Sequence, residues 1–522
     1  MILGADVVDL SCLQFALTAL YHFLFVPLTL GLSLLLAIME TIYVMTGRDI
    51  WRLMVKYWGV LFGINFVLGV ATGLTMEFQF GTNWAYYSHY VGDVFGAPLA
   101  IEGMMAFFLE ATFVGLFFFG WDKVSKFQHL CCTWLLALGT NLSALWILIA
   151  NGWMQNPVGA KFNYQTMRME VESFYDIMFN PVAQAKFVHT ISAGYVTGSI
   201  FVLSISAYFL LRGRNQEFAK RSMTVAISFG LASALSVVVL GDESGYVANS
   251  NQKMKIAAME AMWHTEAAPA GLTIFGIPNE KTQTTDYEIK LPYALGLIAT
   301  RSFNQPLMGI AELIEESKAK IQEGILAYNA LSLLRHDPTN TQLQSDFEKH
   351  SYALGYGLLL KKYTDNIAEA TEVQINQAAQ DLKPHVLPLF FSFRIMVACG
   401  FFFIFLFACG FYLSVKRRLD STRWYLHLAF WALPLPWVAA ELGWVVAEYG
   451  RQPWAVQGIL PTFLGVSSVT SAQVLTSLIG FFVFYSVLAV IEVYLMVKYI
   501  RLGPDNYNLG PHAHLEEQNN AA

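Results

Sequence analysis

Long apolar runs alternate with short polar loops along most of this chain. Each run reaches or exceeds the ~20 residues that a helix needs to cross the hydrocarbon core of a bilayer. The pattern predicts an all-α, polytopic membrane bundle of about nine transmembrane helices. The expected spans are 14–45, 55–80, 96–120, 129–152, 182–211, 222–242, 388–415, 424–447 and 471–500.

The loops between these runs differ in their basic charge. Lys and Arg gather in alternate loops, for example in 212–221 and 416–423, whereas loop 81–95 contains neither. Because basic loops stay on the cytoplasmic side, this alternation predicts an outside N-terminus and an inside C-terminus. It also places the long segment 243–387 outside.

The segment 243–387 holds a large share of the charged residues and an amphipathic stretch, Ile310–Leu334, which predicts a helix. A connection of this length is usually a functional lid or an inserted small domain. The expected organisation is 1–242 with six transmembrane helices, 243–387 as a periplasmic loop, 388–502 with three helices, and 503–522 as a polar cytoplasmic tail.

Composition agrees with a membrane protein. The chain has 522 residues, is 55% hydrophobic and only 13% charged, with a mean hydropathy of +0.46, whereas soluble domains are about 25% charged. The five cysteines form no CxxCH motif and no metal-binding spacing, so they are expected to be core residues. No Lys or Arg precedes Arg48, so no cleavable signal peptide is expected.

Ionisable side chains inside the apolar runs are the candidates for chemistry. A charged group at the bilayer centre costs roughly 2.5–3.5 kcal/mol on insertion scales, so such residues usually mark a pathway or a cofactor. His22 and His189 are the two histidines of this kind, and imidazole is a common ligand of haem iron. Four acidic residues join them: Glu77, Glu102, Glu110 and Glu448.

The predicted topology places most of these groups towards the outer side. His22 and His189 are each expected about two turns into a span that starts outside, and Glu448 at the outer end of the eighth span. Glu102 and Glu110 are eight residues apart on one helix, so they share a face and form a ladder running inward.

Each candidate also has a structural explanation. A single buried His can hydrogen-bond a neighbouring helix, and a Met in an apolar span, such as Met396, is usually core packing. Glu448 can pair with Arg451, and Glu102 can cap its helix. Several unrelated accidents on one side of the membrane are less probable than one shared site, so the cluster favours membrane redox chemistry.

Longer sequence blocks carry a family resemblance. The chain closely resembles the large subunit, subunit I, of bacterial cytochrome bd quinol oxidases, of the branch with a long quinol loop. The blocks are LQFALTALYHFLFVPLTLG with His22, GVATGLTMEFQFGTNW with Glu77, GAPLAIEGMMAFFLEATFVGLFFFGW, NLSALWILIANGWMQNP, NPVAQAKFVHT with His189, GDESGY, FRIMVACG with Met396, and GWVVAEYGRQPW with Glu448.

The resemblance implies three haems. His189 and Met396 match the two ligands of a low-spin haem b, and Arg394 matches a cation beside that haem. His22 and Glu448 match single ligands, which leave iron an open face for oxygen. We expect His22 to serve the chlorin haem d and Glu448 a high-spin haem b. Trp444 and Arg451, in the block of Glu448, are expected to contact a haem.

The resemblance also implies a reaction. Lys255 and Glu260 match quinol-oxidising positions in the outer loop, and ubiquinol is the expected reductant. Electrons would pass from quinol through the low-spin and high-spin b haems to oxygen at haem d, which is reduced to water. Protons would be released outside and taken from the cytoplasm, generating proton motive force without pumping. Glu110, with Glu102 above it, is the expected inner proton route; Ser143 and Asn151 are weaker candidates.

Two other functions stay open on the residues alone. A proton-coupled transporter also buries carboxylates, but it usually shows inverted repeats, and none is visible here. A haem protein without oxidase activity needs the His189–Met396 pair at most. The resemblance implies an inner-membrane complex with a second large subunit and single-helix small subunits; the expected partners are these subunits, ubiquinol, oxygen and lipid, with no nucleic acid.

Overall fold

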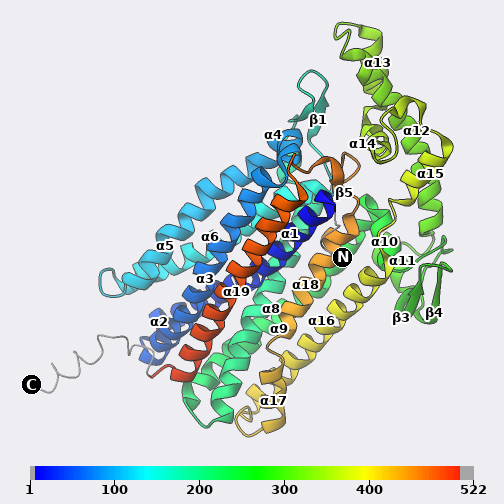
Figure 1. Ribbon diagram of the computed structural model, residues 1–522. Helices are drawn as coiled ribbons and strands as arrows, with labels where there is room; N and C mark the ends of the chain where they lie inside the picture. Colours follow the sequence, from blue (N-terminus) through cyan, green and yellow to red (C-terminus); the bar gives the residue numbers. More distant parts are fainter. Residues whose placement is uncertain (1–5, 506–522) are drawn as a thin grey trace, which may run out of the picture.

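The computed structural model describes residues 6–505. Within these residues, nine helical stretches are long and apolar enough to cross a membrane. This result confirms the predicted number of spans and the all-α class. They run side by side as one bundle (Figure 1). The stretches are α1 (Val7–Phe23) with α2 (Val26–Thr46), α3 (Asp49–Thr82), α4 (Ala85–Ile101) with the π-helix η2 (Glu102–Phe107) and α5 (Phe108–Phe119), α6 (Lys126–Gln155), α7 (Phe174–Met178) with α8 (Pro181–Leu211), α9 (Gln216–Asn251), α16 (Val386–Val415), α17 (Arg423–Trp431) with α18 (Leu435–Glu448) and the 3₁₀ turn η6 (Tyr449–Arg451), and α19 (Ser471–Leu502).

Two spans are broken near prolines. The first stops at Phe23 and resumes at Val26, just before Pro27, and the eighth is interrupted before Leu435, with Pro434 and Pro436 at the new start. Proline has no backbone N–H and cannot continue a helical hydrogen-bond ladder, so a helix resumes with proline in its first turn.

The first span starts earlier than its hydropathy indicates. Asp6 accepts a hydrogen bond from the Val7 backbone N–H at 2.6 Å and caps α1, so the helix begins at Val7 instead of 14. His22 therefore lies at the end of α1, more than four turns from its start. The expected depth of two turns was wrong for His22.

Two other boundaries also differ from expectation. The third span begins at Ala85, so Glu102 lies in mid-span. It therefore does not cap the start of the span, and the structural explanation of Glu102 as a cap was wrong. The sixth span continues to Asn251, so GDESGY belongs to α9 and does not open a loop. Polar residues lower the mean hydropathy of both extensions although the helices continue through them.

The segment after α9 forms a separate layer over one end of the bundle, at the upper right of Figure 1. Its hairpin, β3–β4, is antiparallel, and Ile310–Leu334 is a helix as predicted. The elements are α10 (Lys253–Met259), β3 (Leu272–Asn279), β4 (Thr284–Leu291), α11 (Ala294–Thr300), α12 (Ile310–Leu334), α13 (Thr341–His350), η3 (Ser351–Ala353), α14 (Leu354–Leu358), η4 (Leu359–Lys362), η5 (Ile367–Glu369) and α15 (Glu372–Gln380).

Short strands and turns complete the same end of the molecule. Two further antiparallel pairs, β1–β2 and β5–β6, follow α6 and α18. Their bounds, with the neighbouring 3₁₀ turn, are β1 (Ala160–Asn163), β2 (Arg168–Val171), β5 (Trp454–Val456), β6 (Leu460–Pro461) and η7 (Thr462–Leu464).

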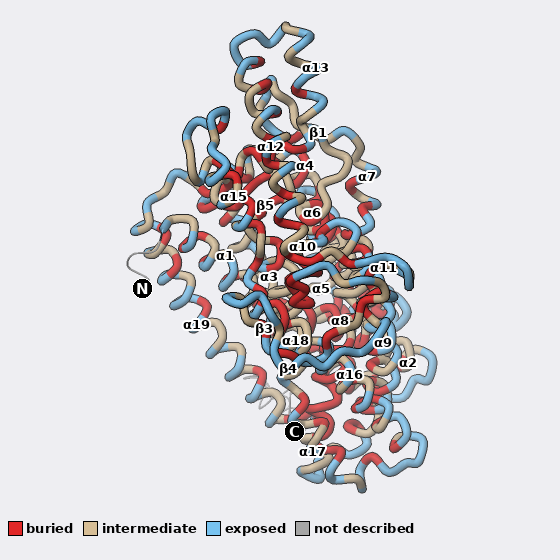
Figure 2. The backbone as a smooth tube through the Cα atoms, turned by 90° about the vertical axis from the view of Figure 1, so that its right-hand side faces the viewer, coloured by how far each residue is buried: buried red, intermediate tan, exposed pale blue. Residues whose placement is uncertain are grey.

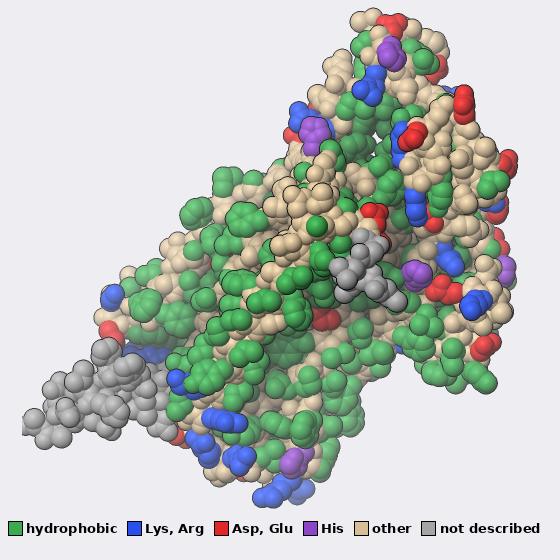
Figure 3. Space-filling view, viewed as in Figure 1, with side chains coloured by type: hydrophobic (Ala, Val, Ile, Leu, Met, Phe, Trp, Pro, Cys, Tyr) green, Lys and Arg blue, Asp and Glu red, His purple; other side chains and the backbone are tan. Residues whose placement is uncertain are grey.

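The buried core runs along the centre of the bundle (Figure 2), where α8 packs against α2, α6 and α9. A glycine contact brings α2 and α8 together: a Cβ on Gly31 would lie 2.7 Å from the Cα of Gly198. Residues 253–385, between α9 and α16, are called the outer segment from here on. Figure 3 shows a broad apolar band, with basic side chains at the end opposite the outer segment. The inside–outside orientation stays a prediction from loop charge, and residues 506–522 of the expected tail lie outside the described part.

Candidate functional site

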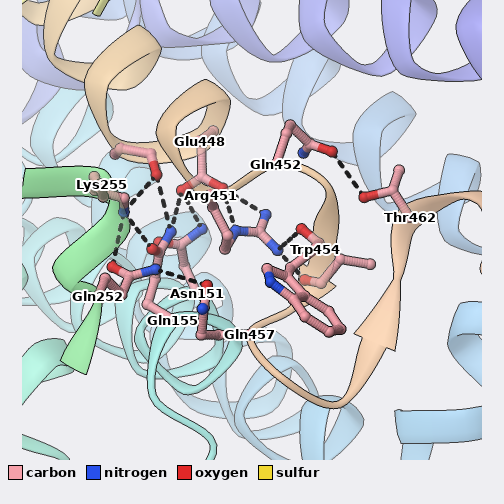
Figure 4. A network of polar contacts seen from close by, with 12 residues as sticks. Asn151, Gln155, Gln252, Lys255, Glu448, Arg451, Gln452, Trp454, Gln457 and Thr462 are labelled. Atoms are coloured by element: carbon pink, nitrogen blue, oxygen red, sulfur yellow. Dashed lines mark hydrogen bonds and ion pairs between the residues drawn. The ribbon is translucent and has the colours of Figure 1, made fainter. Parts of the chain in front are cut away.

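Glu448 is the centre of a polar cluster at the outer end of α18 (Figure 4). Its Oε1 accepts hydrogen bonds from Asn151 and Gln155 of α6, each at 3.0 Å. Its Oε2 accepts from the guanidinium of Arg451 at 2.6 Å. These contacts confirm the expected pairing with Arg451 and hold the carboxylate in one orientation.

Lys186, on α8, is a member of this cluster that sequence reasoning missed. Its Nζ lies 3.5 Å from Oε1 of Glu448, donates to Asn151, and stands over the Trp444 ring at 5.5 Å from the centroid. Two cations therefore neutralise one partly buried carboxylate. Lys186 is three residues before His189, and its position inside an apolar run was the available signal.

Lys255, in α10, connects the outer segment to this cluster. It is 7% exposed, and its Nζ donates to Gln155 at 2.7 Å, Gln252 at 2.8 Å and the Ala447 carbonyl at 2.8 Å. Burial, with the nearby positive charge of Lys186, holds the pKa of Lys255 well below that of a free lysine. Gln155 bonds both Lys255 and Glu448, so the two share a neighbour.

Glu260 follows α10 but faces another helix. It is 2% exposed, and its Oε2 accepts from Arg394 of α16 at 2.7 Å. Burial raises the pKa of Glu260, and the charge of Arg394 opposes this rise. Since Arg394 is two residues before Met396, this ion pair ties the outer segment to the Met396 helix.

A cavity of about 250 Å³ opens between the outer segment and the turn after α18. Its wall includes Lys255, Gln252, Tyr356, Arg451 and Trp454. The cavity therefore lies directly over the Glu448 cluster. Glu260 is not part of its wall, so the structure separates the two charged residues that the sequence placed at one quinol site.

His22 is oriented by a hydroxyl of α3. Its Nδ1 lies 2.9 Å from Oγ1 of Thr72, which also lies 2.8 Å from the Leu68 carbonyl. In the tautomer in which the hydroxyl donates its single proton to that carbonyl, Nδ1 of His22 donates to Thr72. Nε2 is then the bare nitrogen, as a metal-ligating imidazole requires.

His189 and Met396 come from α8 and α16, and both helices pack against α9 and α18. Nδ1 of His189 is buried and makes no hydrogen bond of standard geometry with any residue in 6–505, although the Val237 backbone lies beside it. The pair is thus placed by neighbouring helices in an apolar environment.

A glycine faces each of the three candidate His and Met ligands. A Cβ on Gly73 would lie 3.2 Å from Cε1 of His22, and one on Gly241 would lie 3.3 Å from Cε1 of His189. A Cβ on Gly443 would lie 3.3 Å from Sδ of Met396. Side chains there would crowd the ligands, so glycine lets a neighbouring helix approach each ligand closely. The imidazole and thioether donors are ones that haem iron accepts, so the residues present fit haem.

Glu102 and Glu110 both face α6, in agreement with the predicted ladder. Ser143 donates to Oε1 of Glu102 at 2.7 Å, and a Cβ on Gly139 would lie 2.9 Å from Cγ of Glu110. Both carboxyl groups are buried. Glu77 differs, since its side chain is exposed on the surface of α3.

Glu441 is a second residue that sequence reasoning missed. Both of its carboxyl oxygens are buried, and neither has a hydrogen-bond partner within residues 6–505. It lies on α18 between Trp437, which donates to the Leu24 carbonyl at 2.7 Å, and Trp444, whose ring contacts Phe23. It therefore faces the end of α1 that carries His22. In the sequence, Glu441 could have been recognised as a candidate because it lies seven residues, about two helical turns, before Glu448.

Comparisons with known proteins agree with this arrangement. A family model described as cytochrome bd terminal oxidase subunit I matches residues 10–504. The chain is 51% identical over 499 residues to cytochrome bd-II ubiquinol oxidase subunit 1 of Escherichia coli (strain K12), covering 96% of this chain and 97% of the relative. It is 36% identical over 500 residues to cytochrome bd ubiquinol oxidase subunit 1 of Bacillus subtilis (strain 168), covering 96% and 94%.

A solved structure shares the whole architecture. The bd oxidase from Geobacillus thermodenitrificans superposes with a TM-score of 0.77 at 25% identity, over 96% of this chain and 100% of that chain. With nine candidate spans, the protein is a multi-pass protein of the bacterial inner membrane. The family match over nearly the full length, together with the two relatives, shows that this chain belongs to the family of cytochrome bd terminal oxidase subunit I.

Proposed function

We propose that this chain is the haem-bearing subunit of a terminal oxidase that oxidises ubiquinol on the outer side and reduces oxygen to water. The observation that carries the proposal is the convergence of the Glu448 cluster, the Lys255 cavity and the two histidines in a chain of this family. Bound haems would supply the electron transfer and oxygen binding that no side chain supplies. The side chains would bind and orient the haems and the quinol, and they would move protons.

His189 and Met396 would hold a low-spin haem b. Ligation by an imidazole and a thioether would leave no site for oxygen and would raise the reduction potential of such a haem, as an acceptor of quinol electrons requires. Arg394 lies two residues from Met396, with its guanidinium on Glu260 at 2.7 Å and on the Thr273 carbonyl at 2.7 Å. It positions a positive charge beside this site.

His22 and Glu448 would each hold one further haem. Our assignment is haem d to His22 and high-spin haem b to Glu448. Two cations, Arg451 and Lys186, keep Glu448 ionised, which suits an anionic ligand. All four lone pairs of this carboxylate face donors, so coordination requires one oxygen to exchange a donor for the metal.

The cavity over Lys255 is the proposed quinol head-group site, within the segment 243–387 predicted as the quinol loop. Quinol oxidation releases two protons, so the site needs a proton acceptor. Burial lowers the pKa of Lys255, so its amine is neutral at lower pH than a free lysine. The neutral amine gives up one of its three hydrogen bonds, and its lone pair can then accept a proton. Glu260 lies on the other side of α10, where it accepts a hydrogen bond from Arg394 and does not line the cavity.

Glu110 and Glu102 are the proposed inner proton route. Both are buried carboxyl groups on the α6 side of the third span, and Ser143 hydrogen-bonds the upper one. Asn151, two turns above Ser143 on the same helix, reaches Glu448. One face of α6 thus connects the ladder to the outer cluster.

Family membership implies that the subunit works in a complex with other subunits and with quinol. We propose a second large membrane subunit and single-helix small subunits as its partners. Exposed apolar side chains on α19, such as Phe482, Val490 and Val493, are available to lipid or to these partners.

The test is quinol-driven oxygen uptake by the purified complex, combined with absorption spectra in the presence and absence of carbon monoxide. We expect uptake together with a chlorin band in the red that carbon monoxide shifts. Retained haem without uptake favours a haem protein that is not an oxidase. Absence of haem, with proton-coupled solute flux, favours a transporter.

A further inference from the structure

A buried His–Glu pair lies at the basic end of the bundle, far from the groups described above. His129, in the first turn of α6, and Glu40 of α2 are only 2% and 1% exposed at their side chains, and Nδ1 lies 2.6 Å from Oε1. Nε2 of the same ring faces the Phe117 carbonyl at 3.0 Å. Thr133 hydrogen-bonds the other carboxyl oxygen of Glu40 at 2.5 Å.

These contacts set the proton content of the pair. Both ring nitrogens face acceptors, so the ring and the carboxyl group together must carry two protons, one of them on Nε2 towards the Phe117 carbonyl. Either the ring carries both as an imidazolium against a carboxylate, or Glu40 donates its own proton to Nδ1. Both forms are neutral overall, and interconverting them moves one proton along a 2.6 Å contact. The pair can therefore hold a proton with no net charge in the interior.

The pair lies one aromatic ring below the basic surface. The Trp121 ring covers His129, with 3.9 Å between the centroids. Arg52 and Lys56 of α3 stand over Trp121 at 5.5 and 5.3 Å. Other charges at this end are Asp122, which is 3.6 Å from Arg52, and Lys126, which stands over Tyr43. The turn Gly120–Lys123 thus separates the pair from the aqueous side.

Polar groups continue along the same seam between α2 and α6. Two turns further, Ser33 of α2 and Thr140 of α6 hydrogen-bond at 3.1 Å. Thr140 follows Gly139, against which Glu110 packs. Between these levels stand the small residues Ala37 and Ala137. The interval of seven residues is ~10 Å along each helix, the length of about three hydrogen-bonded water molecules.

We propose that His129 and Glu40 form the proton-loading pair at the cytoplasmic end of the route to Glu110 and Glu102. The inference rests on the proposed oxidase function. In each cycle the pair passes one proton, carried by water across this ~10 Å interval, to the Ser33–Thr140 level and takes one from the cytoplasm through the Trp121 turn. O–H and N–H bonds are exchanged, no electron moves, and the pair returns to its starting state.

The test compares Glu40→Gln and His129→Gln with a matched control in the purified complex, reconstituted in vesicles. Gln at 40 keeps the shape and can hydrogen-bond His129 and Thr133, but it cannot release a proton. The control is Trp134→Phe, which removes the 3.1 Å hydrogen bond from Trp134 to Thr41 between the same two helices, one residue from Thr133 and Glu40.

The readouts are the rate of proton uptake from the basic side, its pH profile, and the rate at which quinol reduces the low-spin haem. We expect both Gln variants to slow proton uptake at least about tenfold and to change its pH profile. Haem reduction stays at the wild-type rate, Glu40→Asp restores much of the uptake, and Trp134→Phe has no effect.

Wild-type uptake in both Gln variants would overturn the inference while leaving the oxidase intact. Equal slowing in Trp134→Phe would also overturn it, because the effect would then come from helix packing. If the Gln variants fail to assemble, Glu40→Asp decides: a wild-type pH profile in that variant removes the pair from the route. Failure of the proposed function itself is distinct, since the wild-type complex would then consume no oxygen.

Discussion

Glu448 and His189 have opposite surroundings, although both are proposed iron ligands in the outer half of the bundle. The carboxylate of Glu448 has Asn151, Gln155, Arg451 and Lys186 around it. The imidazole of His189 has an apolar environment with one backbone group beside it. We infer that a charged ligand inside a membrane must be neutralised and hydrogen-bonded. A neutral ring, in contrast, needs only space and packing.

The comparison predicts that the two sites fail in different ways. Removing the imidazole removes a ligand and nothing else, because no network depends on it. Removing Arg451 leaves the carboxylate in place beside Lys186, but without two of its hydrogen bonds.

His189→Ala should abolish the low-spin haem b signal completely, since Met396 alone cannot provide two strong ligands. The complex should still assemble, because His189 makes no side-chain hydrogen bond that holds the bundle within residues 6–505. The measurement is the reduced-minus-oxidised spectrum of the purified complex. A retained low-spin signal would exclude His189 as the ligand.

Arg451→Gln should disturb the high-spin haem at Glu448 while sparing the low-spin haem. Arg451 is 6% exposed and supplies two hydrogen bonds to Oε2, so its loss leaves a buried charge with Lys186 alone. Because Lys186 still compensates the charge, the loss of stability should stay below the ~3–5 kcal/mol of an uncompensated buried charge. Carbon monoxide difference spectra and thermal unfolding measure both effects, and Arg451→Lys is the control that keeps the charge.

Lys255→Gln should slow quinol oxidation roughly 100-fold and remove its pH dependence. Because burial lowers the pKa of Lys255, the neutral amine that accepts a proton forms at lower pH than in a free lysine. The wild-type rate should therefore rise with pH through this lowered pKa and then level off. Stopped-flow reduction of the low-spin haem at a series of pH values tests this, and an unchanged rise in Lys255→Gln would refute it.

Thr72→Val should have the smallest effect. The substitution removes the 2.9 Å contact that orients His22. It leaves the imidazole of His22 in place and keeps the size of the side chain at position 72. Mutating a hydrogen-bond partner of a ligand typically costs about 10–100-fold in metal affinity or activity. We expect a shifted spectrum of the His22 haem and faster loss of that haem on dilution, with the haem at Glu448 unchanged.

The helix count was predictable because it depends on a local signal, and the same signal singles out most of the candidate ligands, whose role stays a prediction. Nine apolar runs mark nine spans, and His22, His189 and Glu448 are conspicuous inside them. The breaks at Phe23 and before Leu435 were not predicted, since hydropathy stays high through a proline kink. Helix extensions such as α9 to Asn251 were missed for the opposite reason, because their polar residues resemble a loop.

The partners of the ligands could not be predicted from spacing. Lys186, Asn151 and Glu448 come from three helices, and only packing brings them to one point. The same holds for His129 and Glu40, which are 89 residues apart. Lys255 and Glu260 are the opposite case, because they are close in sequence but not in space. Five residues separate them, and they lie on different sides of α10.

The central claim is that this chain holds one two-ligand haem site and two one-ligand sites. The most direct measurement compares carbon monoxide difference spectra of His22→Ala and Glu448→Ala in the purified complex. The account predicts that His22→Ala loses the chlorin band, that Glu448→Ala loses the high-spin b signal, and that both keep the low-spin signal of His189 and Met396. Loss of the same haem in both variants, or of the low-spin signal in either, would contradict it.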